Sequence, residues 1–478
     1  MLDLKAKDLN RESRKGIAKI AKNILLGVLG NFFGVLCGLR FSALIPTLLA
    51  TATFAPAQDW IKTGTGLGVE KVRIAVPDFK ASNSDPRNAA LLKTFNDTLW
   101  NDLDNAGIFE MVSKSFYPLG PVGVPGDVKF ESWNAPPPNA AMLVFGNLVA
   151  AGTNVTVQGW LYDVKNIASP QVLGKQYTDA ATPQAARMIA HKFADEIILR
   201  LGGGINGIAE TQIYFVSARG GHKEIWAMDY DGANQHTVTT LGTISLSPHI
   251  SPDGSRLAFS SFTGAGWEIR MFSLELNRLV SFPRLGGTNL SPAWSPDGTK
   301  LAFSSSRSGK PEIHVVDQSG GNLHRITNSG TTNVSPVWNR KTGTEITWVS
   351  RRGDLPQIYM EGADGTNIQP ITDQGYAVSP SWSPNGQFLV FSWMRHYGAG
   401  APGAQDIYIM DVVSKQWVQL THDGGRNDFP SWSPDGRHIV FQSNRSGSLQ
   451  IWEMLADGSN QKQLTTSGNN SEPDWSWK

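Results

Sequence analysis

The sequence predicts a two-domain protein: a small α/β (α+β) N-terminal domain, followed by an all-β six-bladed β-propeller that the C-terminal strand closes. Two observations carry this prediction. Strand and helix patterns alternate over residues 71–205, and from residue 208 a strand–turn–strand motif recurs at nearly constant spacing. A chain of 478 residues is long enough for both domains.

The composition is that of a folded, turn-rich protein. The chain contains 49 Gly and 16 Trp, and its formal net charge is only +1. This charge balance gives no reason to expect a nucleic-acid partner. The single cysteine, Cys37, excludes a disulfide bond within the chain.

Residues 1–57 are predicted to be a cleaved export signal. A basic stretch is followed by two apolar runs, which Arg40 separates. Ala55 and Ala57 form a small-x-small site for signal peptidase, so we expect cleavage between Ala57 and Gln58 and no membrane span after processing. Neither apolar run alone reaches the ~20 residues that span a bilayer, which disfavours a membrane anchor.

A second interpretation places the true start of the protein later. Residues 39–57, "LRFSALIPTLLATATFAPA", form a compact signal peptide by themselves. The true start would then lie near residues 35–39, and the preceding residues would be an extension of the chain.

Residues 58–70 are predicted to be a flexible mature N-terminal segment. Trp60 and Ile61 are followed by "KTGTGLG", which has little propensity for regular structure. One interpretation is a frayed terminus. The other is a peptide that docks on a partner, by adding a strand or filling a groove, with Trp60 and Ile61 as its anchors.

Residues 71–205 are predicted to form the α/β domain. "KVRIAVPDF" is typical of a buried strand, and residues 86–107 have apolar side chains at helical spacing. Further strands are expected before a second helix, "ARMIAHKFADEIILRLGGG". His191 lies in that helix, where we expect no Asp, Cys or His at ligand spacing, so we interpret it as structural.

Residues 208–478 are predicted to form the propeller. The prolines that open each repeat are Pro248, Pro292, Pro336, Pro380, Pro430 and Pro473, and their spacings are 44, 44, 44, 50 and 43 residues. A period of about 40–50 residues with four strands per repeat is typical of propeller blades. The first repeat lacks this opening strand and the last six residues supply one, so we expect the C-terminal strand to complete the first blade and close the ring.

Large side chains two residues after each proline are predicted to fill the space between blades. They are Ile250, Trp294, Trp338, Trp382, Trp432 and Trp475. Gly and Asp hold the repeated Ser-Pro-Asp-Gly turns, and one Asp per turn makes a poor calcium site. No nucleophile elbow, zinc-binding His-Glu-x-x-His or phosphate loop is present in the sequence, so we expect no catalytic residue, cofactor or metal.

Two sets of repeat positions are predicted to share one propeller face. Three residues before each proline lie Ser245, Asn289, Asn333, Ala377, Asn427 and Asn470. Four residues after the aromatic side chain of each second strand lie Arg219, Thr263, Arg307, Arg352, Arg395 and Arg445. One interpretation is structural, with Asn capping loops and Arg pairing with acidic neighbours. The other is a basic-rimmed funnel for an acidic or amide-rich partner.

The order of these parts resembles the TolB family of the bacterial Tol–Pal envelope system. The resemblance covers residues 58–478 and rests on the signal, the domain ending "AHKFADEIILRLGG" and the blades with "WSPDG" turns. Departures are the 395–405 insertion, the sequence "WNRKTGTE" in place of one Ser-Pro-Asp-Gly turn, and a divergent 115–140 loop.

The resemblance implies a periplasmic scaffold that is not an enzyme, that holds no cofactor and that is expected to be a monomer. It further implies that one propeller face binds a Pal-like lipoprotein and that the mature N-terminal segment binds a TolA-like inner-membrane protein. This role supports outer-membrane integrity and constriction at cell division. The alternatives are an extracytoplasmic propeller with another protein or small ligand as partner, and a propeller enzyme that uses the central channel.

Overall fold

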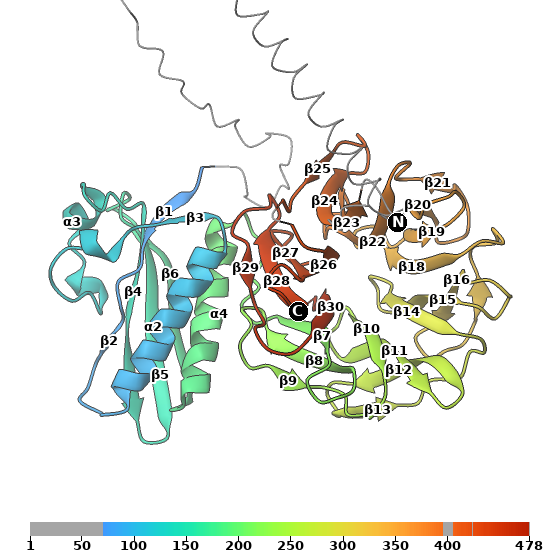
Figure 1. The fold of residues 1–478 in the computed structure, drawn as a ribbon. Coiled ribbons are helices and arrows are strands. Elements are labelled where there is room, and N and C mark those ends of the chain that lie inside the picture. The colour runs from blue at the N-terminus through green and yellow to red at the C-terminus, as the bar shows by residue number, and fades with distance from the viewer. Residues whose placement is uncertain (1–69, 395–404, 423, 478) are drawn as a thin grey trace, which may run out of the picture. The chain divides into compact units, whose positions relative to one another are not determined.

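The computed structural model describes residues 70–394, 405–422 and 424–477 (Figure 1). The predicted fold class is confirmed, because a small α/β domain is followed by six four-stranded sheets, of which one includes the last strand. Within these ranges no helix is both long and apolar enough to cross a membrane. The predicted signal segment, the mature N-terminal segment with Trp60 and Ile61, and Arg395 lie outside the described residues.

The α/β domain is built on one mixed sheet. Its strands lie in the order β3-β1-β4-β5-β6, and β2 also pairs with β4. β1 is parallel to β3 and β4, whereas β5 is antiparallel to β4 and β6. The strands are β1 (Val72–Ala75), β2 (Lys80–Ala81), β3 (Phe109–Met111), β4 (Met142–Ala151), β5 (Asn154–Asp163) and β6 (Gln171–Ala180).

Two long helices, α2 (Asn88–Asn105) and α4 (Pro183–Leu201), cover one face of this sheet (Figure 1). Leu91, Phe95 and Leu99 recur at helical spacing in α2 and are at most 2% exposed. Thr182 caps α4, because its hydroxyl accepts a hydrogen bond from the Ala185 amide at 3.2 Å. The apolar stripes predicted from the sequence therefore pack into the core of this domain.

Short elements cover a second apolar cluster of this domain. They are η1 (Lys114–Phe116), η2 (Pro125–Asp127) and α3 (Phe130–Asn134). Trp133 of α3 is 2% exposed and packs in this cluster with Phe145 of β4. The segment between β3 and β4 thus supplies core residues of the domain as well as connecting its strands.

Five blades follow one another along the chain (Figure 1). Their strands are β10 (Ser245–Ile250), β11 (Arg256–Thr263), β12 (Gly266–Ser273) and β13 (Arg278–Val280); β14 (Asn289–Trp294), β15 (Lys300–Ser305), β16 (Glu312–Asp317) and β17 (His324–Arg325); β18 (Asn333–Trp338), β19 (Glu345–Ser350), β20 (Gln357–Gly362) and β21 (Gln369–Pro370); β22 (Tyr376–Trp382), β23 (Phe388–Met394), β24 (Asp406–Asp411) and β25 (Trp417–Gln419); β26 (Asn427–Trp432), β27 (His438–Ser443), β28 (Gln450–Leu455) and β29 (Lys462–Gln463).

The sixth blade joins the two ends of the propeller sequence. It consists of β30 (Asn470–Trp475), β7 (Gln212–Ser217), β8 (Glu224–Asp229) and β9 (His236–Thr237), in this order. The Trp475 indole donates a hydrogen bond to the Thr211 hydroxyl at 2.8 Å. The C-terminal strand therefore covers the inner edge of β7 and closes the ring, as predicted.

Each first strand bends at the residue before its proline. The six residues have positive φ angles of 51–54°: Ser247, Ser291, Ser335, Ser379, Phe429 and Glu472. Pairing with the second strand shifts in register at the same place, as in a β-bulge. Non-glycine residues rarely adopt this conformation. Its repetition in every blade places all six residues around the central channel.

The large side chains predicted between the blades are buried. Ile250, Trp294, Trp338, Trp382, Trp432 and Trp475 are at most 5% exposed. Two of them also donate hydrogen bonds to the preceding blade. The Trp338 indole donates to the Ala293 carbonyl, and the Trp382 indole donates to the Thr347 hydroxyl, each at 3.1 Å. These residues therefore hold neighbouring blades together through packing and hydrogen bonds.

Candidate functional site

One face of the propeller carries both predicted sets of repeat positions. Asn289 at the start of β14 pairs with Ser305 at the end of β15, which pairs in turn with Glu312 at the start of β16. The loop into each first strand and the turn between the second and third strands therefore lie together. We call this the partner face, and we call the face with the Ser-Pro-Asp-Gly turns the opposite face.

The positions of the predicted amide ring are buried within their blades. Ser245, Asn289, Asn333, Ala377, Asn427 and Asn470 are each at most 1% exposed. The Asn333 amide donates to the Glu312 carboxylate at 2.7 Å, and its oxygen accepts from the Trp348 indole at 2.9 Å. These contacts fix loops within one blade. Any contribution of this set to partner binding therefore acts through the loops that the side chains hold.

Two arginines of the second set are held by their own blades. The guanidinium of Arg219 lies 4.9 Å from the Trp226 ring centroid, and that of Arg445 lies 4.8 Å from the Trp452 ring centroid. Arg445 also donates to the Asn427 side-chain oxygen at 2.9 Å. This arrangement differs from the acidic pairing that the structural interpretation expected.

Arg307 and Arg352 of the second set are exposed on the partner face. The Arg352 guanidinium lies 5.1 Å from the Tyr359 ring centroid, which supports the side chain from below. In the blade that carries Thr263, the hairpin of β11 and β12 is longer, and no arginine occupies this position. Among the described arginines of this set, Arg307 and Arg352 are therefore the exposed ones, whereas Arg219 and Arg445 are partly buried.

A cavity of about 130 Å³ occupies the central channel and is lined by residues of the six first strands. The bulged residues contribute four serine hydroxyls, together with Phe429 and Glu472. Phe429 remains 36% exposed. At the bulged position, four serines are thus joined by one aromatic and one acidic side chain, which breaks the pseudo-symmetry, while prolines and tryptophans make up much of the remaining wall.

Arg340 and Trp477 line this cavity at its end toward the opposite face. Both occupy the position that is proline in the other four blades, and they come from blades on opposite sides of the ring. The Arg340 guanidinium lies 4.4 Å from the Trp477 ring centroid and donates to the Trp432 carbonyl at 3.3 Å. Burial lowers the pKa of Arg340 to about 10, so the group stays cationic at neutral pH.

The acidic side chains of the channel bond to neighbouring backbone. Glu472 accepts from the Ser247 amide at 2.7 Å, and Asp474 accepts from the Ile250 amide at 3.0 Å. Burial raises the pKa of Glu472, and burial lowers the pKa of His249. The channel therefore presents one fixed cation, Arg340, at its end toward the opposite face. Its carboxylates, Glu472 and Asp474, already accept hydrogen bonds from the backbone.

His191 belongs to a buried polar cluster. Its Nδ1 lies 2.7 Å from an Asp102 carboxylate oxygen, and the Tyr230 hydroxyl donates to the other oxygen. The expectation that no Asp lies at ligand spacing from His191 is wrong, because Asp195 follows it by four residues in α4. Asp102 of α2, 89 positions away in sequence, also contacts the ring. His191 is 1% exposed, so its interpretation as a structural residue agrees with its burial. Within the described ranges, no group of three or more His, Cys, Asp or Glu side chains could hold a metal ion.

The sequence-based analysis missed the residues that give the channel its chemistry. Arg340, Trp477, Phe429 and Glu472 all replace the residue that most repeats share at their position. The signal was present in the aligned repeats, as exceptions to the serine before each proline and to the proline of each turn. The residues shared by the repeats indicate the fold, whereas these exceptions carry the chemistry of the channel.

Comparison with known proteins identifies the family. A family model described as the TolB amino-terminal domain matches residues 65–169, and one described as the TolB beta propeller domain matches residues 200–401 and 373–478. The chain belongs to the TolB family. The resemblance seen in the sequence is thereby confirmed.

The TolB relatives support this assignment over part of the chain. A Tol-Pal system protein TolB of Cereibacter sphaeroides is 32% identical over 231 residues, covering 47% of this chain and 50% of the relative. One of Desulfosudis oleivorans is 31% identical over 236 residues, covering 49% and 52%. This chain therefore spans about half the length of the curated relatives that it matches.

A solved structure supports the fold over a longer stretch. TolB from Acinetobacter baumannii is similar with a TM-score of 0.70 and 23% sequence identity, covering 85% of this chain and 97% of the other. At this identity the similarity supports the arrangement of the α/β domain and the propeller.

Proposed function

We propose that this TolB-family chain is a non-enzymatic periplasmic scaffold of a Tol–Pal system. The partner face would bind a Pal-like lipoprotein, and residues 58–69 would bind a TolA-like protein, in support of outer-membrane integrity and constriction at division. The observation that carries the proposal is the match of both TolB domains, in order, along one chain. The names of the relatives, Tol-Pal system protein TolB, support it further.

The size and chemistry of the channel favour a protein partner over a small substrate. A cavity of about 130 Å³ is well below the roughly 300–1,000 Å³ that small-molecule sites usually offer. It can accept one side chain of a bound protein. Glu472 and Asp474 bond to the channel wall, which leaves them poorly placed as a general acid and base.

We predict that reversing two charges on the partner face weakens Pal binding. The variant Arg307→Glu/Arg352→Glu replaces the exposed cations with anions. Each change removes an attraction and adds a repulsion toward an acidic partner, so binding to the purified Pal-like lipoprotein should weaken roughly tenfold or more. Isothermal titration calorimetry at two salt concentrations measures the loss and its dependence on salt.

The matched control reverses two exposed cations on the opposite face. Lys300→Glu/Lys341→Glu changes the net charge of the protein by the same amount. Its affinity should stay within about twofold of the wild type. Equal weakening by both variants would assign the effect to net charge and remove support for the partner face.

We further predict that the mature N-terminal segment binds TolA independently of the folded domains. Deleting residues 58–66 removes Trp60 and Ile61, the two large apolar side chains of the segment. Binding to a TolA-like protein should be lost, while the melting temperature and Pal binding remain close to wild type. Retained TolA binding in a pull-down would contradict this assignment.

A further inference from the structure

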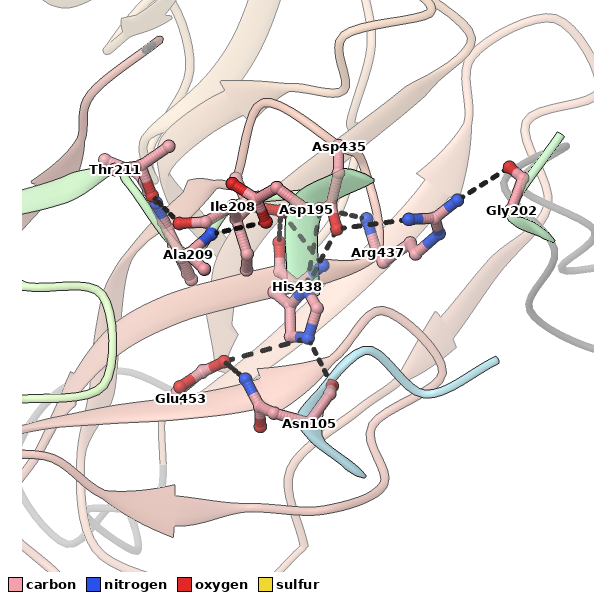
Figure 2. Close-up of polar contacts among 12 residues, drawn as sticks. Asn105, Asp195, Gly202, Ile208, Ala209, Thr211, Asp435, Arg437, His438 and Glu453 are labelled. Atoms are coloured by element: carbon pink, nitrogen blue, oxygen red, sulfur yellow. Dashed lines mark hydrogen bonds and ion pairs between the residues drawn. The ribbon is translucent and has the colours of Figure 1, made fainter. Parts of the chain in front are cut away.

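One Ser-Pro-Asp-Gly turn contacts the C-terminal ends of both long helices of the α/β domain (Figure 2). The Arg437 guanidinium donates to the Gly202 carbonyl, at the end of α4, at 2.9 Å. The His438 Nε2 lies 2.8 Å from the Asn105 carbonyl, at the end of α2. A single turn of the propeller thus holds two helices of the other domain.

The sequence of this turn differs from the corresponding turns of the other blades. The two residues after its glycine are Arg437 and His438, where the other four turns with a glycine at this position have Ser-Arg, Thr-Lys, Thr-Glu and Gln-Phe. Both side chains are at most 1% exposed. Hairpin geometry needs neither residue at these positions, so their presence requires a separate explanation.

The end of a helix explains why cations lie here. Unpaired carbonyls give the C-terminus of a helix a partial negative charge, which a nearby cation stabilises. Arg437 supplies this cation at every physiological pH. His438 supplies a cation only when it is protonated. The neutral ring has a single N–H, so it can donate to Asp435 or to the Asn105 carbonyl but not to both.

Charged groups from several elements face His438. Asp435, on its own turn, lies 3.3 Å from Nδ1, and Glu453 of β28 lies 3.8 Å from Nε2. Lys462 of β29 lies 3.1 Å from Glu453 and partly neutralises it. Arg437 lies 3.7 Å from Asp435 and partly neutralises it in the same way. Each carboxylate thus has its own cation, but the two carboxylates are the charged groups that face the ring nitrogens of His438, which favours its protonated form.

Asp195 of α4 is a second titratable group at this contact. Its Oδ1 accepts a hydrogen bond at 3.1 Å from the amide of Ala209, in the segment that connects the domains (Figure 2). Backbone amides of Ala209 and Glu210 favour the charged carboxylate, whereas its burial and the acidic neighbours Asp102 of α2 and Glu210 disfavour it. Lys192, Glu196 and Asp435 line the same pocket. Burial and the acidic neighbours outweigh the hydrogen bonds, so a negative charge on Asp195 is unfavourable when the domains are docked.

We propose that this contact is a proton-dependent latch, in which protonated His438 and protonated Asp195 tighten the docking of the α/β domain on the propeller. Loss of these protons leaves the Asn105 carbonyl without a cation and adds an anion beside Asp102 and Glu210. The latch concerns docking of the domains and does not depend on the proposed partners.

The direction of the pH dependence follows from both groups. Burial alone would lower the pKa of His438, but Asp435 and Glu453 outweigh it, so its pKa is raised. Burial, with Asp102 and Glu210, raises the pKa of Asp195 to about 7. Both groups thus hold protons more tightly in the docked state, and docking weakens as pH rises. The stabilisation by protonated Asp195 is lost as pH rises from about 4 to 7, and that by protonated His438 is lost as pH rises above about 6.5.

Hydrogen exchange of the full chain tests the latch. The reporting amides are those of Gly204 and Thr211 in the connecting segment, compared between pH 6 and pH 8 after correction for intrinsic rates. We expect their protection to fall about tenfold in the wild type. Asp195→Asn should keep more protection at pH 8, and His438→Gln should already lose protection at pH 6.

A matched variant and an internal reference complete the test. His324→Gln changes an exposed histidine of another blade and should leave the wild-type pH dependence intact. Protection of β14 and β15 amides, away from the contact, shows that each variant is folded. Equal wild-type protection at both pH values, or unchanged pH dependence in both Asp195→Asn and His438→Gln, would overturn the proposal.

Discussion

Removing residues 470–478 is expected to prevent the propeller from folding. This change deletes β30 and exposes the inner edge of β7. It also removes Trp475, which is fully buried and whose loss alone should cost about 3–5 kcal/mol. A stability of roughly 5–15 kcal/mol cannot absorb that loss together with a whole strand.

The expected observation is an insoluble chain or one that lacks a cooperative thermal transition by circular dichroism. The matched control ends at Ser476, which keeps β30 and removes only Trp477 and Lys478. It loses the contact of Trp477 with Arg340 but should fold and melt within several degrees of the full chain. A cooperative transition in the longer deletion at the wild-type temperature would show that closure is not needed.

The correct prediction that β30 closes the ring shows that repeat spacing can locate the strands of a propeller. The even spacing of the six prolines fixes the period, and Trp475 in the unfinished last repeat fixes where the ring closes. Both features depend on residues that every blade must share in order to pack on its neighbours. The helix predicted over residues 86–107 agrees with α2, because an apolar stripe at helical spacing can be read from the local sequence alone.

The side-chain directions at the candidate site could not be predicted in this way. Repeat position places Asn289 and Asn333 at the partner face, and the structure agrees with that placement. Whether such a side chain faces solvent or its own loop depends on nonlocal partners, such as Trp348 for Asn333. Contacts between the domains, such as His438 with Asn105, join residues more than 300 positions apart and leave no periodic signal.

Glu361 is another exception to the repeat, with a consequence for stability. It occupies a third-strand position that is Met228, Phe272, Val316, Met410 or Met454 in the other blades. It is 1% exposed, and neither of its carboxylate oxygens has a hydrogen-bond partner within the described residues. Burial raises the pKa of Glu361 to about 7. An acidic side chain here costs free energy that an apolar one would not.

Glu361→Met is expected to stabilise the protein by about 1–3 kcal/mol at pH 8, where the wild-type carboxylate is charged. Because the folded-state pKa is raised, wild-type stability should fall as pH rises from about 4.5 to 7 and level off above. The variant should lose this part of the pH dependence, so its advantage should shrink toward pH 5. Urea unfolding at pH 5 and pH 8 measures both effects.

Two comparison variants separate charge from packing at Glu361. Glu361→Gln removes the charge but leaves a buried amide without partners, so it should flatten the pH dependence and gain little stability. Glu275→Met changes an exposed glutamate and should stay within about 0.5 kcal/mol of the wild type. If Glu361→Met is no more stable than the wild type at pH 8, the Glu361 carboxylate must have a hydrogen-bond or ionic partner in solution. The claim that it is buried without a partner would then be wrong.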